Sequence, residues 1–257
     1  MSDTAKVVLI TGGGSGMGRE AARRFAAEGA TVALFDINTA GMAETIGTFE
    51  NIHSWTVDMT DFAAVCAAVR EVEETLGPVE RLYNCAAIMP FGKLVEQDNA
   101  IIHKQMAINY GGLVNITQAV LPGMLQRGRG DFVSFASMAG IIPMMLTGAY
   151  TATKFAVVAF TETLYHENMN SGVRFACVCP PAVATPLLQQ GKDSAWPKML
   201  ESQGNPIAPR VVIEAIEDCL KKGKFMVLPT RDAKIGAIMR RLLPGLIWKQ
   251  VHQVEGF

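Results

Sequence analysis

The feature that most constrains the fold is a regular alternation of short β-rich runs with longer helical patterns. The β-rich runs lie at 6–11, 31–36, 53–58, 81–84, 131–136, 173–179 and 224–228. Several are apolar on both faces, as expected of strands in a parallel sheet that helices cover on each side. The helical patterns lie at about 17–28, 40–49, 62–76, 98–126, 149–170 and 209–222. The alternation predicts an α/β fold, a Rossmann-like doubly wound parallel sheet of about seven strands with helices on both faces.

The length of the chain fits one domain. At 257 residues it is near the upper limit for one hydrophobic core, and 49% hydrophobic residues are enough to fill that core. We therefore expect residues 1–257 to form a single domain. The one long irregular stretch is roughly 180–208, and such stretches inside a compact domain are usually functional. We expect it to form the substrate loop.

Composition excludes several classes of function. A net charge of −1, without a basic stripe before the C-terminal tail, argues against nucleic acid as a partner. Five cysteines without a CxxC pair suggest neither a disulfide framework nor a zinc site, and no other metal site is expected. The N-terminus lacks the charged and apolar regions of a signal peptide, so a cytoplasmic location is expected. Polar residues and prolines interrupt both long uncharged stretches, 105–126 and 132–153, so neither is expected to span a membrane.

A glycine-rich loop, TGGGSGMG from Thr11 to Gly18, follows the first strand and precedes the first helix. Its spacing matches neither the G-x-G-x-x-G dinucleotide fingerprint nor a P-loop, which needs Lys and then Ser or Thr after its last glycine. A strand that runs into glycines and then a helix still brings backbone N–H groups and the positive end of a helix dipole to one point. That point suits a phosphate; the alternative is a glycine-rich turn without a ligand.

Asp36 ends the second strand, 18 residues after Gly18. A carboxylate at this place can accept hydrogen bonds from both hydroxyls of an adenosine ribose. It would repel a 2′-phosphate, and neither Ser15 nor Ile37 and Asn38 supplies a compensating cation. The sequence therefore favours NAD over NADP. The alternative is that Asp36 is a helix cap or a turn residue.

Tyr150 and Lys154 are four residues apart in a helical pattern, so their side chains share a face. A neighbouring ammonium favours the phenolate, but a base at neutral pH needs the tyrosine pKa to fall from about 10 to near 7, worth roughly 4 kcal/mol. We expect Lys154 and a cationic nicotinamide ring to provide this together. Ser137 follows the strand 131–136, where its hydroxyl can bind the oxygen that Tyr150 protonates or deprotonates. These three residues predict proton transfer coupled to hydride transfer.

These residues resemble the short-chain dehydrogenases/reductases, with NAD preferred and hydroxysteroid-type enzymes as the nearest kind, over about Val7 to Thr230. TGGGSGMG resembles the cofactor loop T-G-x-x-x-G-x-G of that family. The resemblance implies a cofactor site made of Thr11, Gly12, Ser15, Gly16, Met17, Gly18, Asp36, Ile37, Asp58, Met59, Asn84, Ala86, Tyr150, Lys154, Pro180, Val183 and Thr185. Within it, Met17 is expected to contact the pyrophosphate, Asp58 and Met59 the adenine, and Val183 and Thr185 the carboxamide.

The resemblance also implies a catalytic tetrad of Asn109, Ser137, Tyr150 and Lys154. In it Asn109 would hold a proton-relay water and Lys154 would also bind the nicotinamide ribose. An alternative for Asn109 is that its amide bonds only to backbone. The sequence departs from the family pattern at Cys85, Ala87, Ala136 and Pro181. Pro181 has the clearest physical consequence, because proline fixes φ and lacks an N–H beside the nicotinamide.

Apolar residues predominate among the candidates for the substrate pocket, so a bulky lipophilic secondary alcohol or ketone, such as a steroid, is the predicted substrate. The strongest candidates are Met89, Met138, Met144, Leu187 and Trp196, and the wider set adds Pro90, Phe91, Ile142, Met145, Leu146, Leu188 and Met199. These positions could equally be ordinary core. The alternatives for the function are a dehydrogenase of small polyols or acyl substrates and a non-catalytic NAD-sensing protein on the same fold.

The tail 231–257 is predicted to be amphipathic. Its apolar residues Ile235, Ile238, Met239, Leu242 and Leu243 share one helical face, and Pro244 and Gly245 break the pattern. We favour packing of this face on a partner subunit or over the cleft, with contact to a membrane surface as the alternative. The family resemblance also implies a homo-oligomer, a dimer or tetramer, that pairs through the helices at 98–126 and 149–170.

Overall fold

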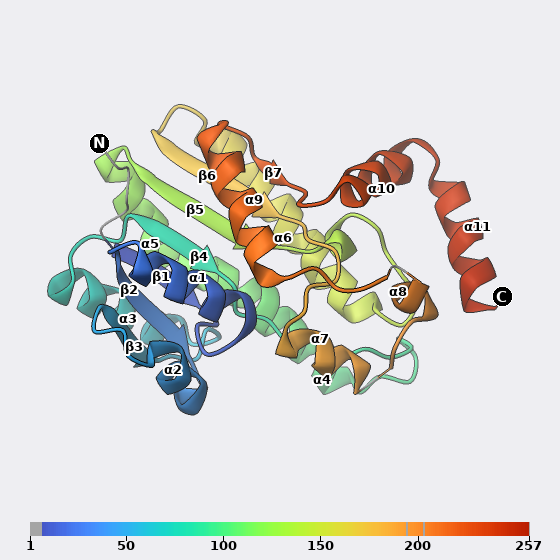
Figure 1. Ribbon diagram of the computed structural model, residues 1–257, viewed down its shortest axis with the longest axis horizontal. Coiled ribbons are helices and arrows are strands. Elements are labelled where there is room, and N and C mark those ends of the chain that lie inside the picture. Colours follow the sequence, from blue (N-terminus) through green and yellow to red (C-terminus); the bar gives the residue numbers. More distant parts are fainter. Residues whose placement is uncertain (1–6, 194, 203, 257) are drawn as a thin grey trace.

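The computed structural model describes residues 7–193, 195–202 and 204–256 (Figure 1). One sheet contains seven strands in the order β3-β2-β1-β4-β5-β6-β7, and every neighbouring pair is parallel. The strands are β1 (Val7–Thr11), β2 (Thr31–Asp36), β3 (Ile52–Thr56), β4 (Arg81–Asn84), β5 (Gly130–Phe135), β6 (Val173–Val178) and β7 (Met226–Val227). The predicted doubly wound sheet is confirmed. Lys6, predicted to begin the first strand, lies outside the described residues, as do positions 194 and 203 of the predicted substrate loop and position 257 of the tail.

The helices lie between the strands as the pattern predicts, with two corrections. Their bounds are α1 (Gly16–Ala27), α2 (Thr39–Ile46), α3 (Phe62–Thr75), α4 (Asn99–Met106), α5 (Gly112–Arg127), α6 (Gly148–Glu167), α7 (Pro186–Lys192), α8 (Lys198–Ser202), α9 (Pro209–Lys221), α10 (Arg231–Leu242) and α11 (Pro244–Glu255). The single helix predicted at 98–126 is wrong, because a π-helical turn at Ala107–Gly111 separates α4 from α5. No helix in the described part of the chain is long and apolar enough to cross a membrane.

The second correction concerns the stretch 180–208, which the sequence predicts to be irregular. It contains α7 and α8, which are seven and five residues long. Helices this short give almost no periodic signal. Pro186 is the first residue of α7, where the missing N–H of proline costs nothing because that N–H has no partner inside a helix.

Two apolar layers flank the sheet. Alternate residues of each strand point to opposite faces, so Val8 and Ile10 of β1 belong to one layer and Val7 and Leu9 to the other. Helices α1, α2 and α9 cover the first layer, and α3, α5 and α6 cover the second. Burial on both faces is the physical reason why the strands read as continuous apolar runs.

The strand order reverses between β1 and β4, since β2 and β3 lie on one side of β1 and β4 to β7 on the other. In an open parallel sheet, ligands bind beyond the carboxyl ends of the strands at such a point. Thr11 ends β1 and Asn84 ends β4, and the two are in register. The polar residues predicted from the motifs therefore gather at one edge of the sheet.

A buried ion network lies at the opposite, amino edge of the strands. Arg81, the first residue of β4, donates to Asp131 of β5 (Nε to Oδ2, 2.8 Å) and to Glu217 of α9 (Nη1 to Oε1, 2.9 Å). Tyr83 also donates to Glu217 (2.8 Å), and Arg174 of β6 donates to Asp131 (2.6 Å). Arg81 and Asp131 are both buried. The network joins three strands to α9, away from the edge that gathers the predicted site.

Replacing Arg81 by Met is expected to destabilise the protein by about 3–5 kcal/mol, because Asp131 and Glu217 each lose their buried partner in β4. The control is Arg129→Met, since the pair between Arg129 and Glu80 is largely exposed on the arginine side and such pairs are worth about 0–1 kcal/mol. Urea unfolding of both variants measures the difference. Equal losses would show that the buried network adds nothing to the fold.

Candidate active site

The glycine loop packs so closely that side chains are excluded from it. Gly12 has φ +67°, and a Cβ there would lie 2.8 Å from the backbone nitrogen of Ala86. A Cβ on Gly18 would overlap the carbonyl oxygen of Gly12. Both positions therefore require glycine, one for its backbone conformation and both for space. The packing fixes the start of α1 against the end of β1.

The N-terminus of α1 suits an anion. Ser15 precedes the helix without a capping hydrogen bond from its side chain, and the first turn contains no acidic residue. The first N–H groups of a helix have no partner within it, and they carry the positive end of the helix dipole. A diphosphate fits the start of α1, because the glycines leave open backbone and the first turn of the helix carries no carboxylate.

Asp36 holds two backbone turns at the end of β2. Its Oδ2 accepts from the N–H of Gly14 (2.8 Å) and its Oδ1 accepts from the N–H of Asn38 (2.9 Å). The turn role considered for Asp36 is therefore present. Each carboxylate oxygen has more than one acceptor site, so these bonds leave capacity for ribose hydroxyls. Ile37, which follows, is exposed beside it.

Arg19, on the first turn of α1, is a cation beside the glycine loop, and its guanidinium has several partners. Its guanidinium donates to the carbonyl oxygen of Gly14 (2.6 Å) and to the hydroxyl of Thr45 (3.1 Å), and it pairs with Glu44 (2.8 Å). The sequence analysis did not identify this role. Arg19 braces the glycine loop from outside, and its charge is balanced by Glu44.

The ends of β1 and β4 are joined by side chains. The hydroxyl of Thr11 donates to Oδ1 of Asn84 (2.7 Å), and it accepts from the N–H of Ala86 (3.2 Å). Thr11 and Asn84 are both buried. Their side chains thus hold the switch point of the sheet together, and the segment after Asn84 starts from a fixed place.

Asp58 and Met59, predicted to meet adenine, follow β3. The Oδ1 of Asp58 accepts from the N–H and the hydroxyl of Thr60, both at 2.8 Å, and these two bonds lower the pKa of Asp58. Met59 is buried, and its carbonyl oxygen accepts from Asn115 of α5 (2.8 Å). The structure thus fixes the backbone here against α5.

Ser137, Tyr150 and Lys154 come together between β5 and α6. The hydroxyl of Ser137 lies near the phenol of Tyr150, whose pKa it lowers in part. Lys154 Nζ lies 5.6 Å from the centre of the Tyr150 ring and donates to the carbonyl oxygen of Phe135 (2.7 Å). Tyr150 and Lys154 are both buried. The spacing of four residues on one helix face produces the predicted neighbourhood.

Burial dominates the electrostatics of this group. It raises the pKa of Tyr150 to about 12, although the Ser137 hydroxyl lowers it in part. Burial also lowers the pKa of Lys154 to about 8. The chain's own groups therefore do not produce the phenolate that the sequence analysis expected from Lys154. Desolvation disfavours both the Tyr150 phenolate and the Lys154 ammonium, and this effect exceeds the attraction between the two charges.

Three thiols surround the ammonium of Lys154, namely Cys85, Cys177 and Cys179. Burial raises the pKa of Cys85, while a hydrogen bond with Cys179 and burial raise the pKa of Cys177. With their pKa values raised, the thiols of Cys85 and Cys177 are no counter-ions for Lys154, whose pKa burial lowers. Within the described ranges, no group of three or more His, Cys, Asp or Glu residues is placed to hold a metal ion.

Asn109 lies in the π-helical turn and is buried. Its Oδ1 accepts from the N–H of Ile88 (2.8 Å), and its Nδ2 donates to the carbonyl oxygen of Ile88 (2.9 Å) and to Thr153 (3.1 Å). Thr153 in turn donates to the carbonyl oxygen of Tyr150 (2.7 Å). The amide thus bonds to more than backbone, and it links the segment after β4 to α6. Sequence reasoning missed Thr153, whose position three residues after Tyr150 on α6 is the available signal.

The segment after β6 closes on itself at its base. Val183 and Ile207 form a parallel bridge. The N–H of Ala184 donates to the carbonyl oxygen of Ile207 (2.9 Å), and the N–H of Ile207 donates to the carbonyl oxygen of Ala182 (3.0 Å). The carbonyl oxygen of Pro180 accepts from the N–H of Met138 (2.9 Å), beside Ser137. Thr185 lies against the glycine loop, since a Cβ on Gly16 would be 3.2 Å from the Thr185 Cβ. Despite Pro181, this segment connects the glycine loop to the serine turn.

The predicted substrate residues largely form one apolar cluster over Tyr150. The Phe91 ring lies edge-on to Tyr150, with 6.0 Å between centroids, and stacks on Trp196 at 6.1 Å. The cluster contains Met89, Phe91, Ala139, Tyr150 and Leu200, with Met144, Leu187, Leu188, Ala195 and Trp196 packed against it. Met138 and Ile142 lie beside α10, against Gly236. The segment from α7 to α8 thus covers the tyrosine with apolar side chains.

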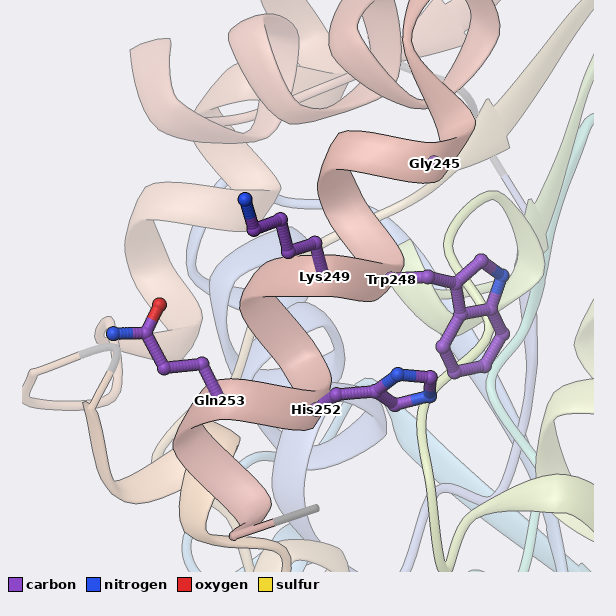
Figure 2. Close-up of a pocket in the computed structure, with 5 residues that line it drawn as sticks. All are labelled: Gly245, Trp248, Lys249, His252 and Gln253. Carbon is purple, nitrogen blue, oxygen red and sulfur yellow. The ribbon is translucent and has the colours of Figure 1, made fainter.

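An open groove of about 670 Å³ lies along α11, at a distance in sequence from these residues (Figure 2). It is lined by Gly245, Trp248, Lys249, His252 and Gln253. Figure 2 shows Trp248 and His252 extending to one side of the helix and Lys249 and Gln253 to the other. None of the predicted site residues lines it.

Comparisons with known proteins identify the family of the chain. The sequence profile of the short chain dehydrogenase family matches residues 6–195. The chain is 36% identical to 2-(S)-hydroxypropyl-CoM dehydrogenase 3 of Xanthobacter autotrophicus over 186 residues, 70% of this chain and 72% of the relative. It is 30% identical to estradiol 17-beta-dehydrogenase 11 of Pongo abelii over 250 residues, 95% of this chain and 81% of the relative.

A solved short chain dehydrogenase/reductase from Burkholderia phymatum, in complex with NAD, superposes with a TM-score of 0.86 at 25% identity and covers 96% of each chain. The chain therefore belongs to the short-chain dehydrogenase/reductase family, an oxidoreductase family that binds nicotinamide cofactors. The predicted resemblance, including that to hydroxysteroid-type dehydrogenases, is confirmed.

Replacing Lys154 by Met is expected to stabilise the protein in the absence of cofactor, by roughly 1–3 kcal/mol at pH 7. The pKa of Lys154 is lowered on folding, so between pH about 8 and 10.5 the folded state holds fewer protons than the unfolded one. The loss of folding stability caused by the buried Lys154 ammonium is fully present below pH 8 and disappears as the pH rises toward 10.5. The gap between variant and wild type should shrink over that window.

Thermal unfolding at pH 7 and pH 10 measures this gap. The control is Lys221→Met, since Lys221 is exposed at the end of α9. A Lys154→Met protein that is less stable than wild type at pH 7, or a gap that widens with pH, would contradict the cost assigned to the buried ammonium.

Proposed function

We propose that the chain forms one catalytic domain of an NAD(H)-dependent oxidoreductase that interconverts a secondary alcohol and a ketone, with Tyr150 as the general acid/base. The observation that carries this proposal is the proximity of the half-buried Ser137 to the buried Tyr150 and Lys154 at the carboxyl edge of the sheet. Dehydrogenase relatives support the reaction class.

Three side chains do the proton chemistry in this proposal. Ser137 binds the reacting oxygen and orients it toward Tyr150. In ketone reduction Tyr150 donates its proton to that oxygen, and in alcohol oxidation it takes the proton. The bound nicotinamide supplies the hydride acceptor or donor. Lys154 holds the Tyr150 side of α6 against β5 and contributes positive charge near the phenol.

Asn109 is a positioning residue in the same proposal. Through Thr153 it connects the backbone at Ile88 to the backbone at Tyr150. π-Helical turns inside helices often lie at functional sites. The turn at Ala107–Gly111 directs the Asn109 amide toward these partners rather than to solvent. The proton-relay water expected from the family resemblance would lie near this turn.

NAD is the proposed cofactor. The half-buried Asp36 carboxylate lies at the end of β2, and Arg19, the cation beside the loop, is balanced by Glu44. A 2′-phosphate would therefore meet negative charge without a free cation from these residues. The glycine loop with Met17 would hold the pyrophosphate, and Pro180, Val183 and Thr185 would hold the nicotinamide side. The solved relative in complex with NAD supports this choice.

The proposed substrate is a bulky lipophilic alcohol or ketone. The side chains that cover Tyr150 are apolar, among them Met89, Phe91, Met144, Leu187 and Trp196. Methionines suit pockets that adapt to large apolar ligands. The relative named for estradiol supports a steroid-like substrate. We also propose a cytoplasmic homo-oligomer, a dimer or tetramer, in which α5 and α6 pair with a second copy.

Tyr150→Phe is expected to lower kcat by roughly 10²–10⁴-fold, the usual contribution of a positioned acid/base, while cofactor binding is retained. The matched control is Tyr165→Phe on the same helix, which should leave turnover unchanged. Steady-state turnover and titration of cofactor binding by fluorescence measure the two effects. Unchanged turnover in Tyr150→Phe would refute the assignment.

A panel of steroids, long-chain secondary alcohols and small polyols, each assayed with NAD and with NADP, tests substrate and cofactor class. We expect the highest kcat/KM with a lipophilic alcohol and NAD. Activity with small polyols alone would overturn the lipophilic substrate, and preference for NADP would overturn the role of Asp36. Cofactor binding without turnover on any of the three classes would favour the non-catalytic alternative.

A further inference from the structure

An apolar stripe on the C-terminal tail has no cover within the described chain. It consists of Ile235, Ile238 and Leu242 on α10, Leu243 at the corner, and Leu246 on α11, and each of these side chains is about half exposed or more. Residues 235, 238 and 242 follow the helical repeat, so they lie on one face. A contiguous apolar patch of this kind on a soluble protein usually marks an interaction surface.

The tail stripe faces away from the protein because the opposite face of α10 packs on the rest of the chain. Ala233 is buried, and Gly236 lies against Ile142 and Met138, where a Cβ would be 3.2 Å from Ile142 Cδ1. α11 is held in turn by α8, since the N–H of Met199 donates to Oε1 of Glu255 (2.9 Å). Figure 1 shows α10 and α11 projecting together at the end of the molecule that carries α8.

Basic residues flank the stripe. The tail from Arg231 to Glu255 contains five basic residues and two acidic ones, in a chain whose net charge is −1. On α10, the exposed Lys234 and Arg241 border the apolar face on one side, and Arg231 lies in line with it. Lys249 is exposed one turn after Leu246 on α11. The tail thus has a net positive charge around a group of exposed aliphatic side chains.

This charge pattern decides between two occupants of the stripe. A second copy that packed the same face on itself in the antiparallel direction would bring the Lys234 and Arg241 sides of the two helices together, which is unfavourable because like charges repel. A surface of anionic headgroups over acyl chains complements both the cations and the stripe. We propose that α10 and α11 dock this protein on a bilayer surface that contains anionic phospholipid.

Docking in this way has a consequence for the candidate active site. The inner face of α10 touches Met138, the residue after Ser137, so the docked helix lies at the rim of the apolar cluster over Tyr150. A lipophilic substrate dissolved in the bilayer would then enter from the lipid beside that rim. This consequence depends on the proposed function, whereas the docking itself does not.

Sedimentation of the full-length protein with vesicles, without substrate or cofactor, tests the docking independently of the reaction. We expect binding to vesicles of phosphatidylcholine with phosphatidylglycerol, weaker binding to phosphatidylcholine alone, and loss of binding as salt rises. Lys234→Glu should weaken binding to the anionic vesicles by roughly tenfold or more, since each basic residue near such a surface contributes about fivefold. Ile235→Asp should weaken it similarly.

Two variants on α3 are matched controls. Phe62→Asp removes an aromatic side chain that is 45% exposed, against 47% for Ile235, and Arg70→Glu reverses an exposed charge. Neither should change vesicle binding. No binding of the wild type to anionic vesicles, or equal losses in the α3 and tail variants, would overturn the proposal. A smaller particle in light scattering for Ile235→Asp, with vesicle binding unchanged, would show that the stripe binds a second copy of the chain. That result would also overturn the proposal.

Discussion

The hydrogen bond from Thr11 to Asn84 is the interaction on which the rest of the site depends. It joins the carboxyl ends of β1 and β4, where the strand order reverses. On one side the glycine loop starts directly after Thr11, and on the other the segment after Asn84 leads to Ile88, where Asn109 holds the backbone. Thr153 carries this line of bonds to Tyr150. Cofactor loop and tyrosine are thus fixed relative to one sheet by a continuous set of contacts.

Buried charge at the candidate active site is not balanced by an opposite charge, as it is elsewhere in the core. Lys154 is buried with a carbonyl oxygen and an aromatic ring as partners and neutral thiols around it, so folding makes its charged form less favourable. Tyr150 is buried in its neutral form. Arg81, at the other edge of the sheet, shows the opposite case, because two carboxylates balance it. The chain compensates buried charge where it needs stability and leaves it uncompensated where the proposed chemistry occurs.

The sequence predicted the sheet, most helices and the neighbourhood of Tyr150, because strand and helix repeats and the spacing of Tyr150 and Lys154 are local properties. It did not predict the π-helical turn at Ala107–Gly111, since a single extra residue in a helix hardly changes the apolar pattern. It also did not predict that burial raises the pKa of Tyr150 and so disfavours the phenolate, because burial depends on the three-dimensional surroundings of the residue. The contacts of Arg19 with Thr45 and Glu44, and of Thr153 with Asn109, join segments that are far apart in the sequence, so local patterns did not reveal them.

The bridge between Val183 and Ile207 has an evolutionary consequence. It joins the two ends of the segment that carries α7 and α8, so both ends stay in place whatever lies between them. Lengthening a loop with fixed ends costs little free energy. An insert held in this way can change in length during evolution without displacing the sheet and the helix that carry Ser137 and Tyr150.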